Sequence, residues 1–330
     1  MSFSSRGVTG AVGLVAALGA SVVYAVSGYH TVLPLLLLTG IAAMAVGLGK
    51  DRPSVAWAVI SKSDLIAVTV LLVAVTPLYL WRVYSTPWQV NSDEITIMSM
   101  AQRLTAAPHT DLLGISDVFG FPSAVFVFVG RLAQVIGGIS LYHSRLVHGT
   151  LGVMCVVAAY GFFRQIVPPL RALLFSLLLG TNHALFAISR MAMRENTSLL
   201  LELIALWLLT RGILRRSRSH IFVAGAFAGV AWYAYFPGRL AVFISLAILF
   251  AIAAFTGSRS NLKLALRYAA VFVLGWAVAA APVMIASKKN PESAFSYSRQ
   301  QFLFYPEGRI LEQSWTGEKT QSAAWKANIR

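Results

Sequence analysis

The sequence predicts an all-α protein, a polytopic membrane helix bundle with external juxtamembrane helices. Of the 330 residues, 57% are hydrophobic and only 12% are charged, and the mean hydropathy is +0.70. Soluble domains average about 25% charged residues, so an ordinary soluble globule and a disordered chain are both excluded. Apolar runs recur along the chain, and Lys and Arg residues concentrate in alternate loops. Both patterns are typical of multi-pass membrane proteins.

Polar breaks divide the chain into about nine apolar segments near the length of roughly 20 residues that a membrane helix needs. The expected spans are 8–26, 31–49, 65–84, 146–163, 172–188, 196–210, 221–236, 240–255 and 268–287. The first span is too long for the apolar region of a signal peptide, so we interpret it as a retained helix. The single cysteine, Cys155, lies in an apolar run, which excludes a disulfide framework and a cysteine-based metal site. The pairs Gly225/Gly229 and Gly10/Gly13 indicate close helix packing.

A further apolar run, 121–138, contains Arg131 and determines the expected orientation. If this run crossed the membrane, the basic segment 211–218 would lie outside, against the positive-inside rule. We therefore expect a cytoplasmic N-terminus and a helix over 121–138 that lies flat on the outer face. Pro122 suits its first turn, and Arg131 can extend to the head groups. Of the 27 Lys and Arg residues, 13 then fall in predicted cytoplasmic loops as orientation signals, and the net charge of +15 indicates no nucleic-acid partner.

Three regions follow from this topology. Residues 1–64 form two N-terminal transmembrane helices and a cytoplasmic loop, and residues 65–287 form the core, including a large external loop over 85–145. Residues 288–330 are polar and external, and we expect them to be a truncated external segment.

The external loop contains the acidic pair Asp93–Glu94, which follows Asn91 and Ser92. Asn91 or Ser92 can cap a helix there, and acidic residues stabilise the first turn of a helix. The structural interpretation is therefore dipole stabilisation on a surface helix. The functional interpretation is a carboxylate that takes a proton from a hydroxyl nucleophile. Because adjacent helical residues point about 100° apart, only one of the pair is expected to face a substrate, and Asp93 is our choice.

A second group of candidates lies at the predicted outer ends of helices. Arg190 and Arg194 are four residues apart, and Glu195 follows them. They are interpreted either as interfacial anchors or as phosphate ligands, because arginine binds phosphate bidentately. Glu202 is an acid inside the same span, with a functional or a structural role.

The segment WYAYFPGRL supplies Tyr233, Tyr235 and Arg239 at another predicted outer helix end, either as an aromatic belt or as part of a pocket. Arg145 begins its span at the same side and is a further candidate phosphate ligand. His183 is alone near an outer helix end, and a structural role is favoured for it. No metal ligand spacing is present, so no cofactor is predicted, and a divalent metal has no support.

Several motifs resemble those of the GT-C superfamily of polyprenyl-phosphate-sugar-dependent glycosyltransferases, in the same order along residues 65–305. They are the acidic pair in SDE, the Pro-led run FPSAVFVFVGRLAQVIGG, the span after SLYHSR, the stretch AISRMAMREN, the segment WYAYFPGR and the stretch KKNPESAFSYSRQQ. The sequence is most similar to bacterial members of the dolichyl-phosphate-mannose–protein mannosyltransferase group, which includes lipid A aminoarabinose transferases.

The resemblance implies roles for individual residues. Asp93 would be the general base with Glu94 as its neighbour, and Arg190, Arg194 and Arg239 would hold the donor phosphate. Tyr235 would line the pocket with Tyr233 and Glu195, and Arg299 falls in a later external loop. The implied reaction is inverting transfer of a sugar from a polyprenyl-phosphate donor to a hydroxyl of a lipid, glycan or protein acceptor. The implied location is the outer face of the bacterial inner membrane.

Two alternatives remain open. In a membrane transporter or lipid flippase, Glu202 and the arginines would line a pathway. In an inactive truncated remnant, the same motifs would persist without activity. The clustering of charges at helix ends favours chemistry on a lipid head group over transport, which needs charges deep in several spans.

Overall fold

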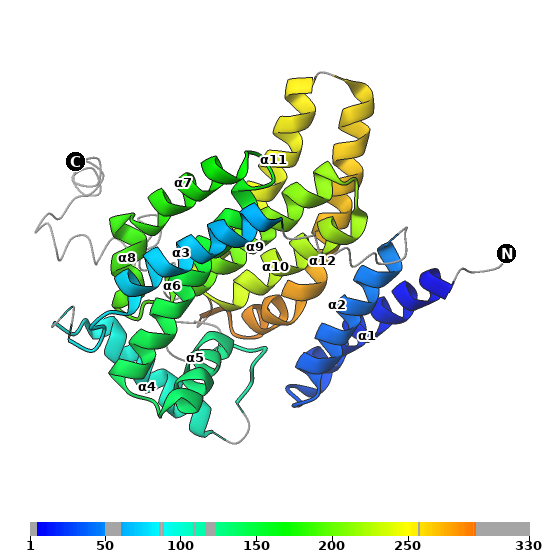
Figure 1. Ribbon diagram of the computed structural model, residues 1–330. Coiled ribbons are helices and arrows are strands. Elements are labelled where there is room, and N and C mark those ends of the chain that lie inside the picture. Colours follow the sequence, from blue (N-terminus) through cyan, green and yellow to red (C-terminus); the bar gives the residue numbers. More distant parts are fainter. Residues whose placement is uncertain are drawn as a thin grey trace, which may run out of the picture.

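The computed structural model describes residues 5–49, 61–85, 87, 89–107, 110–115, 123–256, 258–292 and 294, and these residues fold into helices without a β-sheet (Figure 1). Arg299 and most of the 288–330 segment lie outside the described residues. The helices in chain order are α1 (Ser5–Ser27), α2 (Leu33–Leu48), α3 (Lys62–Leu80), α4 (Ser92–Ala106), α5 (Ser123–Ile136), α6 (Leu141–Phe163), α7 (Pro169–Gly180), α8 (His183–Arg190), α9 (Glu195–Leu214), α10 (Arg218–Val230), the 3₁₀ turns η1 (Ala231–Tyr233) and η2 (Phe236–Arg239), α11 (Leu240–Thr256) and α12 (Arg259–Lys289).

Six helices among the described residues are long and apolar enough to cross a membrane: α1, α3, α6, α9, α12 and the segment Phe236–Phe255 that contains α11. The bent pair α7 and α8 would make a seventh span. An all-helical chain with several membrane-compatible helices is therefore confirmed, whereas the nine predicted spans are not.

The difference arises at three predicted spans. The run 31–49 forms a helix of only 16 residues. The run 172–188 breaks at Thr181–Asn182, where the Asn182 side chain accepts hydrogen bonds from Ala184 N and Leu185 N, and the two helices meet at 57°. Asn182 thus starts a second helix with a new direction. The run 221–236 ends its α-helix at Val230 and continues as 3₁₀ turns, with Pro237 near the start of η2.

The external-loop run 121–138 forms α5, a 14-residue apolar helix that is shorter than a span. One face of α5 is buried, while Arg131 on another face is exposed and bonds only locally, to Gln134 Oε1 at 3.2 Å. Its neighbour α4 begins at Asn91 with a complete capping box, since Asn91 and Glu94 satisfy each other's backbone N–H groups. The predicted cap and helix start are therefore confirmed. Together α4 and α5 pack against the end of the bundle at which α6 begins (Figure 1).

Glycines bring several helices into backbone contact. A Cβ at Gly225 of α10 would collide with the Phe272 carbonyl oxygen of α12, and one at Gly229 would lie 2.6 Å from Trp276 O. Gly13 of α1 faces the Gly40 backbone of α2 in the same way, at 2.7 Å. The predicted close packing at Gly225/Gly229 and at Gly10/Gly13 is confirmed.

Pro282 lies inside α12 and has no backbone N–H to donate. The Tyr233 hydroxyl bonds to two backbone groups of the same turn. The Tyr233 hydroxyl donates to Ala279 O at 3.2 Å and accepts from Val283 N at 3.2 Å. These two groups would pair with each other in a regular α-helix. Pro282 disturbs this region because its ring conflicts with the preceding turn. The hydroxyl of η1 thereby fixes the α10–α11 connection against α12.

We predict that Gly225→Ala destabilises the protein, because the new methyl group must separate α10 from α12 at backbone level. Overpacking of this kind costs about 1–3 kcal/mol. The matched control is Gly19→Ala in α1, where a Cβ meets nothing within 4 Å. Thermal unfolding of the purified chain in detergent measures both. Equal melting temperatures for the two variants would contradict the close packing of α10 on α12.

Candidate functional site

The candidate site lies where α4 and α5 meet the ends of the bundle helices. Ile97 of α4 and Phe126 of α5 belong to a small apolar cluster with Met100 and Val125, against which Met193 and Tyr235 pack. Met193 joins α8 to α9, and Tyr235 lies between the two 3₁₀ turns. The cluster therefore brings the start of α4 to the same region as the predicted arginine and tyrosine candidates.

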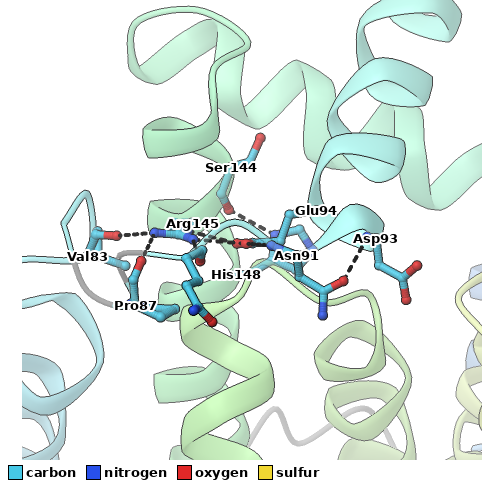
Figure 2. Close-up of polar contacts among 9 residues, drawn as sticks. Val83, Pro87, Asn91, Asp93, Glu94, Ser144, Arg145 and His148 are labelled. Carbon is cyan, nitrogen blue, oxygen red and sulfur yellow. Dashed lines mark hydrogen bonds and ion pairs between the residues drawn. The ribbon is translucent and has the colours of Figure 1, made fainter.

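Glu94 and Arg145 form a buried ion pair at the centre of this region (Figure 2). Arg145 Nε donates to Glu94 Oε1 at 2.8 Å, and Nη2 donates to Oε2 at 2.9 Å. Both residues are only 1% exposed. The pair joins α4 to α6 across 51 residues of sequence. A bidentate arginine–carboxylate contact of this geometry is among the strongest polar contacts in proteins.

The remaining donors of Arg145 bind the chain that leads into α4. Its Nη1 donates to Val83 O at 3.4 Å and to Pro87 O at 2.8 Å, and its Nη2 donates to Gln89 O at 3.2 Å. All five N–H groups of the guanidinium are thus occupied. The expected phosphate-binding role of Arg145 does not fit this geometry, because a phosphate would have to displace these acceptors.

Asp93 and Glu94 lie in opposite environments although they are adjacent. Glu94 points into the protein toward Arg145, whereas Asp93 is exposed and its carboxylate points away from the ion pair (Figure 2). Asp93 N donates to the Asn91 side chain at 2.9 Å, which anchors the backbone of Asp93 at the first turn of α4. The expectation that only one residue of the pair faces a substrate stays a prediction, and the two residues differ in exposure because they lie on different faces of α4. Asp93 therefore carries an accessible carboxylate on a fixed helix end.

Arg190 is the last residue of α8, and its side chain contacts the C-terminal turn of α3. It is 5% exposed. Its Nη1 donates to Leu78 O at 2.7 Å, and its Nη2 donates to Trp81 O at 2.9 Å. A cation at the carbonyl end of a helix satisfies terminal acceptors and the helix dipole. Arg190 thus joins α8 to α3, and this geometry favours a structural role over direct phosphate binding.

Arg194 and Arg239 stack on aromatic rings at the neighbouring helix ends. The Arg194 guanidinium carbon lies 4.4 Å from the centre of the Tyr235 ring. That of Arg239 lies 5.1 Å from the centre of the Phe236 ring and 5.6 Å from that of Trp232. Cation–π contacts hold a guanidinium in place while its N–H edge remains suited to an anion. Arg194 and Arg239 are therefore predicted phosphate ligands that the structure places against aromatic rings.

The turn between α8 and α9 is built around Ala192, which has φ 51° and is 1% exposed. Met193 N donates to Ile188 O at 3.0 Å, the long bond of a Schellman motif. Glycine usually occupies this left-handed position, and alanine there is sterically costly. The turn separates Arg190 from Arg194, so that one cation lies against α3 and the other against Tyr235.

The other predicted site residues that the structure describes form no hydrogen bond or ion pair with Asp93 or with the Glu94–Arg145 pair. Tyr233 is buried and bonded to α12 by its hydroxyl, so it supports the site and does not line it. Glu195 is partly buried in the first turn of α9. His183 is exposed at the opposite end of α8 from Arg190. Within the described ranges, no group of three His, Cys, Asp or Glu residues is arranged to hold a metal ion.

A second polar cluster, centred on Asp111, is not predicted by the sequence analysis. Asp111 Oδ2 accepts from the Tyr24 hydroxyl at 2.8 Å, and Lys289 Nζ donates to Tyr24 O at 3.1 Å. Burial raises the pKa of Asp111 above its usual value, although the bond from Tyr24 opposes this. The cluster ties the external loop to α1 and α12. No motif signals it, because Tyr24, Asp111 and Lys289 lie in unrelated parts of the sequence.

We predict that Arg145→Gln strongly destabilises the chain, because Glu94 would remain buried without a cation. Removing one partner of a buried pair costs about 3–5 kcal/mol. The matched control is Arg131→Gln in α5, where the cation is exposed and bonds only to Gln134. Thermal unfolding in detergent measures both variants.

Combining Arg145→Leu with Glu94→Leu should restore part of the loss relative to Arg145→Leu alone, because no buried charge is then left unpaired. A double variant as unstable as the sum of the single variants would contradict the ion pair.

Comparison of the chain with protein-family models, with curated proteins and with solved structures finds no match. The GT-C resemblance of the motifs therefore stays a prediction. The candidate residues that remain are the exposed Asp93 with the Glu94–Arg145 pair beside it on α4 and α6, and Arg194 and Arg239 on aromatic rings. The apolar cluster with Ile97 and Tyr235 links the region of α4 to that of Arg194.

Proposed function

We propose that the chain is an integral-membrane glycosyltransferase that moves a sugar from a polyprenyl-phosphate donor to a hydroxyl acceptor on the extracytoplasmic face of its membrane. The observation that carries the proposal is the placement of Asp93. Its carboxylate is exposed at the start of α4, while its neighbour Glu94 is held by Arg145 beneath it. A base that must receive a proton has to be accessible and fixed in position, and Asp93 has both properties.

In the proposed reaction, the Asp93 carboxylate takes the proton of the acceptor hydroxyl. The hydroxyl oxygen forms a bond to the anomeric carbon from the face opposite the phosphate, so the configuration inverts. The bond between the anomeric carbon and the phosphate oxygen breaks, and polyprenyl phosphate leaves with the electron pair. Arg194 and Arg239 would stabilise the negative charge that develops on the leaving phosphate, since charge-assisted bonds strengthen as that charge grows.

The distribution of charge favours this proposal over a transporter. Along the described candidate spans, Glu202 of α9 is the only acidic residue more than one turn from a helix end. A transport pathway would need several polar groups in succession through the bilayer. The charged residues of the candidate site instead lie near the ends of α4, α6, α8 and α9 and in η2. The bacterial inner membrane, with a cytoplasmic N-terminus, is the proposed location.

We predict that Asp93→Asn lowers sugar transfer by about 10²–10⁴-fold, the usual contribution of a general base. Membranes that contain the full chain would be supplied with a polyprenyl-phosphate-linked sugar, and release of polyprenyl phosphate would be followed. Because Asp93 is exposed, the variant should unfold at the same temperature as the wild type.

Glu292→Gln is the matched control, since Glu292 is also an exposed carboxylate and lies outside the candidate site. Unchanged turnover of Asp93→Asn would remove Asp93 as the base. Absence of turnover by the unmodified chain with all donors tested would contradict the enzymatic proposal and favour an inactive remnant.

A further inference from the structure

Three N–H donors without acceptors belong to a chain of side chains in contact, from Arg239 through Trp232 to Trp276. The atoms Arg239 Nε, Trp232 Nε1 and Trp276 Nε1 are all buried and have no hydrogen-bond partner within the part of the chain that the structure describes. The Trp232 and Trp276 rings are in edge contact, with centres 5.5 Å apart, and Arg239 stacks on Trp232. Because buried donors normally have acceptors, three neighbouring exceptions indicate a missing group that is rich in acceptor oxygens.

The charge of Arg239 also lacks a counterion. Among the described residues, no carboxylate lies within 4.0 Å of Arg239, and its ring partners Trp232 and Phe236 are uncharged. Arg239 belongs to the candidate span Phe236–Phe255, only three residues after its start. A buried cation in a span is costly unless it is paired with an anion. The missing group is therefore anionic as well as acceptor-rich, which describes a phosphate.

The position of the site along α12 favours a phosphate carried by a lipid. Gly229 meets α12 at Trp276 and Ala279, and Tyr233 bonds to Ala279 and Val283. α12 continues to Lys289, and at 1.5 Å per residue its last ten residues extend about 15 Å beyond this level. Arg239 lies in the first turn of its own candidate span, so the donors lie near one end of an apolar span, where the phosphate of an inserted lipid would also lie.

We infer that Trp232 and Trp276, with Arg239, form the subsite that holds the phosphate of a lipid-linked substrate, and that the indole N–H groups distinguish a phosphorylated lipid from its alcohol. The identity of the lipid as a polyprenyl phosphate rests on the proposed function. It adds two residues, from η1 and α12, that the motifs do not indicate. The two rings would also contact the apolar chain of the lipid next to its phosphate.

A third unpartnered indole supplies the control. Trp207 Nε1 of α9 is also buried without an acceptor, but its ring lies against Gly161 of α6. No cation–π contact joins Trp207 to an arginine among the described residues. Trp207→Phe removes the same N–H group at a position that lacks the charge, so it separates the effect of the subsite from the general effect of losing an indole.

The test measures binding of farnesyl phosphate, farnesol and inorganic phosphate to the purified full chain in detergent. The wild type should prefer farnesyl phosphate over farnesol. Trp232→Phe and Trp276→Phe, which keep an aromatic ring, should each lower this preference about tenfold, the usual loss for a hydrogen bond to a charged group. Arg239→Gln should lower it further, and Trp207→Phe should leave it unchanged. The preference is a ratio, so it does not depend on the fraction of each variant that folds.

Equal preferences in the wild type and both tryptophan variants would overturn the inference, and so would an equal loss in Trp207→Phe. Displacement of farnesyl phosphate by an equal concentration of inorganic phosphate would assign the site to free phosphate and overturn the lipid assignment. Failure of the proposed function gives a different result: the tryptophan-dependent preference would be present, but no sugar would be transferred. Transfer by the wild type with tryptophan-independent binding would reject the inference alone.

Discussion

The ion pair between Glu94 and Arg145 is the contact on which the position of α4 against the helix bundle depends. It joins the first turn of α4 to α6, beside the small apolar cluster through which α4 and α5 contact the residues around Met193 and Tyr235. Moving two charges out of water is costly, and such a pair adds little net stability compared with apolar residues of the same size. The pair instead affects position. With its five donors occupied, Arg145 joins the carbonyl groups of Val83, Pro87 and Gln89 to the first turn of α4. The orientation of Asp93 follows from that of its neighbour.

Residues of one type have opposite roles within this region. Arg145 and Arg190 bond to backbone carbonyls and join helices, whereas Arg194 and Arg239 stack on aromatic rings. The difference lies in what each guanidinium meets, since arginine suits both tasks. The first two arginines fix the framework, and the second two are the candidates for ligand contact. In the same way, Glu94 is structural while Asp93 is accessible, although only one peptide bond separates them.

The sequence is sufficient to predict features that depend on local patterns. Apolar runs predict the helices, Asn91 predicts the start of α4, and Gly225 with Gly229 predicts the contact with α12, because each signal lies within one segment. Contacts between distant segments are not predictable in this way. No sequence pattern near Arg145 indicates Glu94 as its partner. No pattern near Tyr233 indicates that its hydroxyl bonds to the backbone of α12 next to Pro282. The break at Asn182 is also missed, because a capping residue inside an apolar run is outweighed by the hydropathy of its neighbours.

Hydrogen–deuterium exchange of α4 in the Arg145→Gln variant tests the central claim most directly. The account predicts that amides over 92–106 lose protection, because α4 is no longer held on α6 at its first turn. Amides of α10 and α12, which pack through Gly225 and Gly229 away from the ion pair, should lose less protection than those of α4. Unchanged exchange over 92–106 would show that α4 is positioned without the ion pair and would contradict the account.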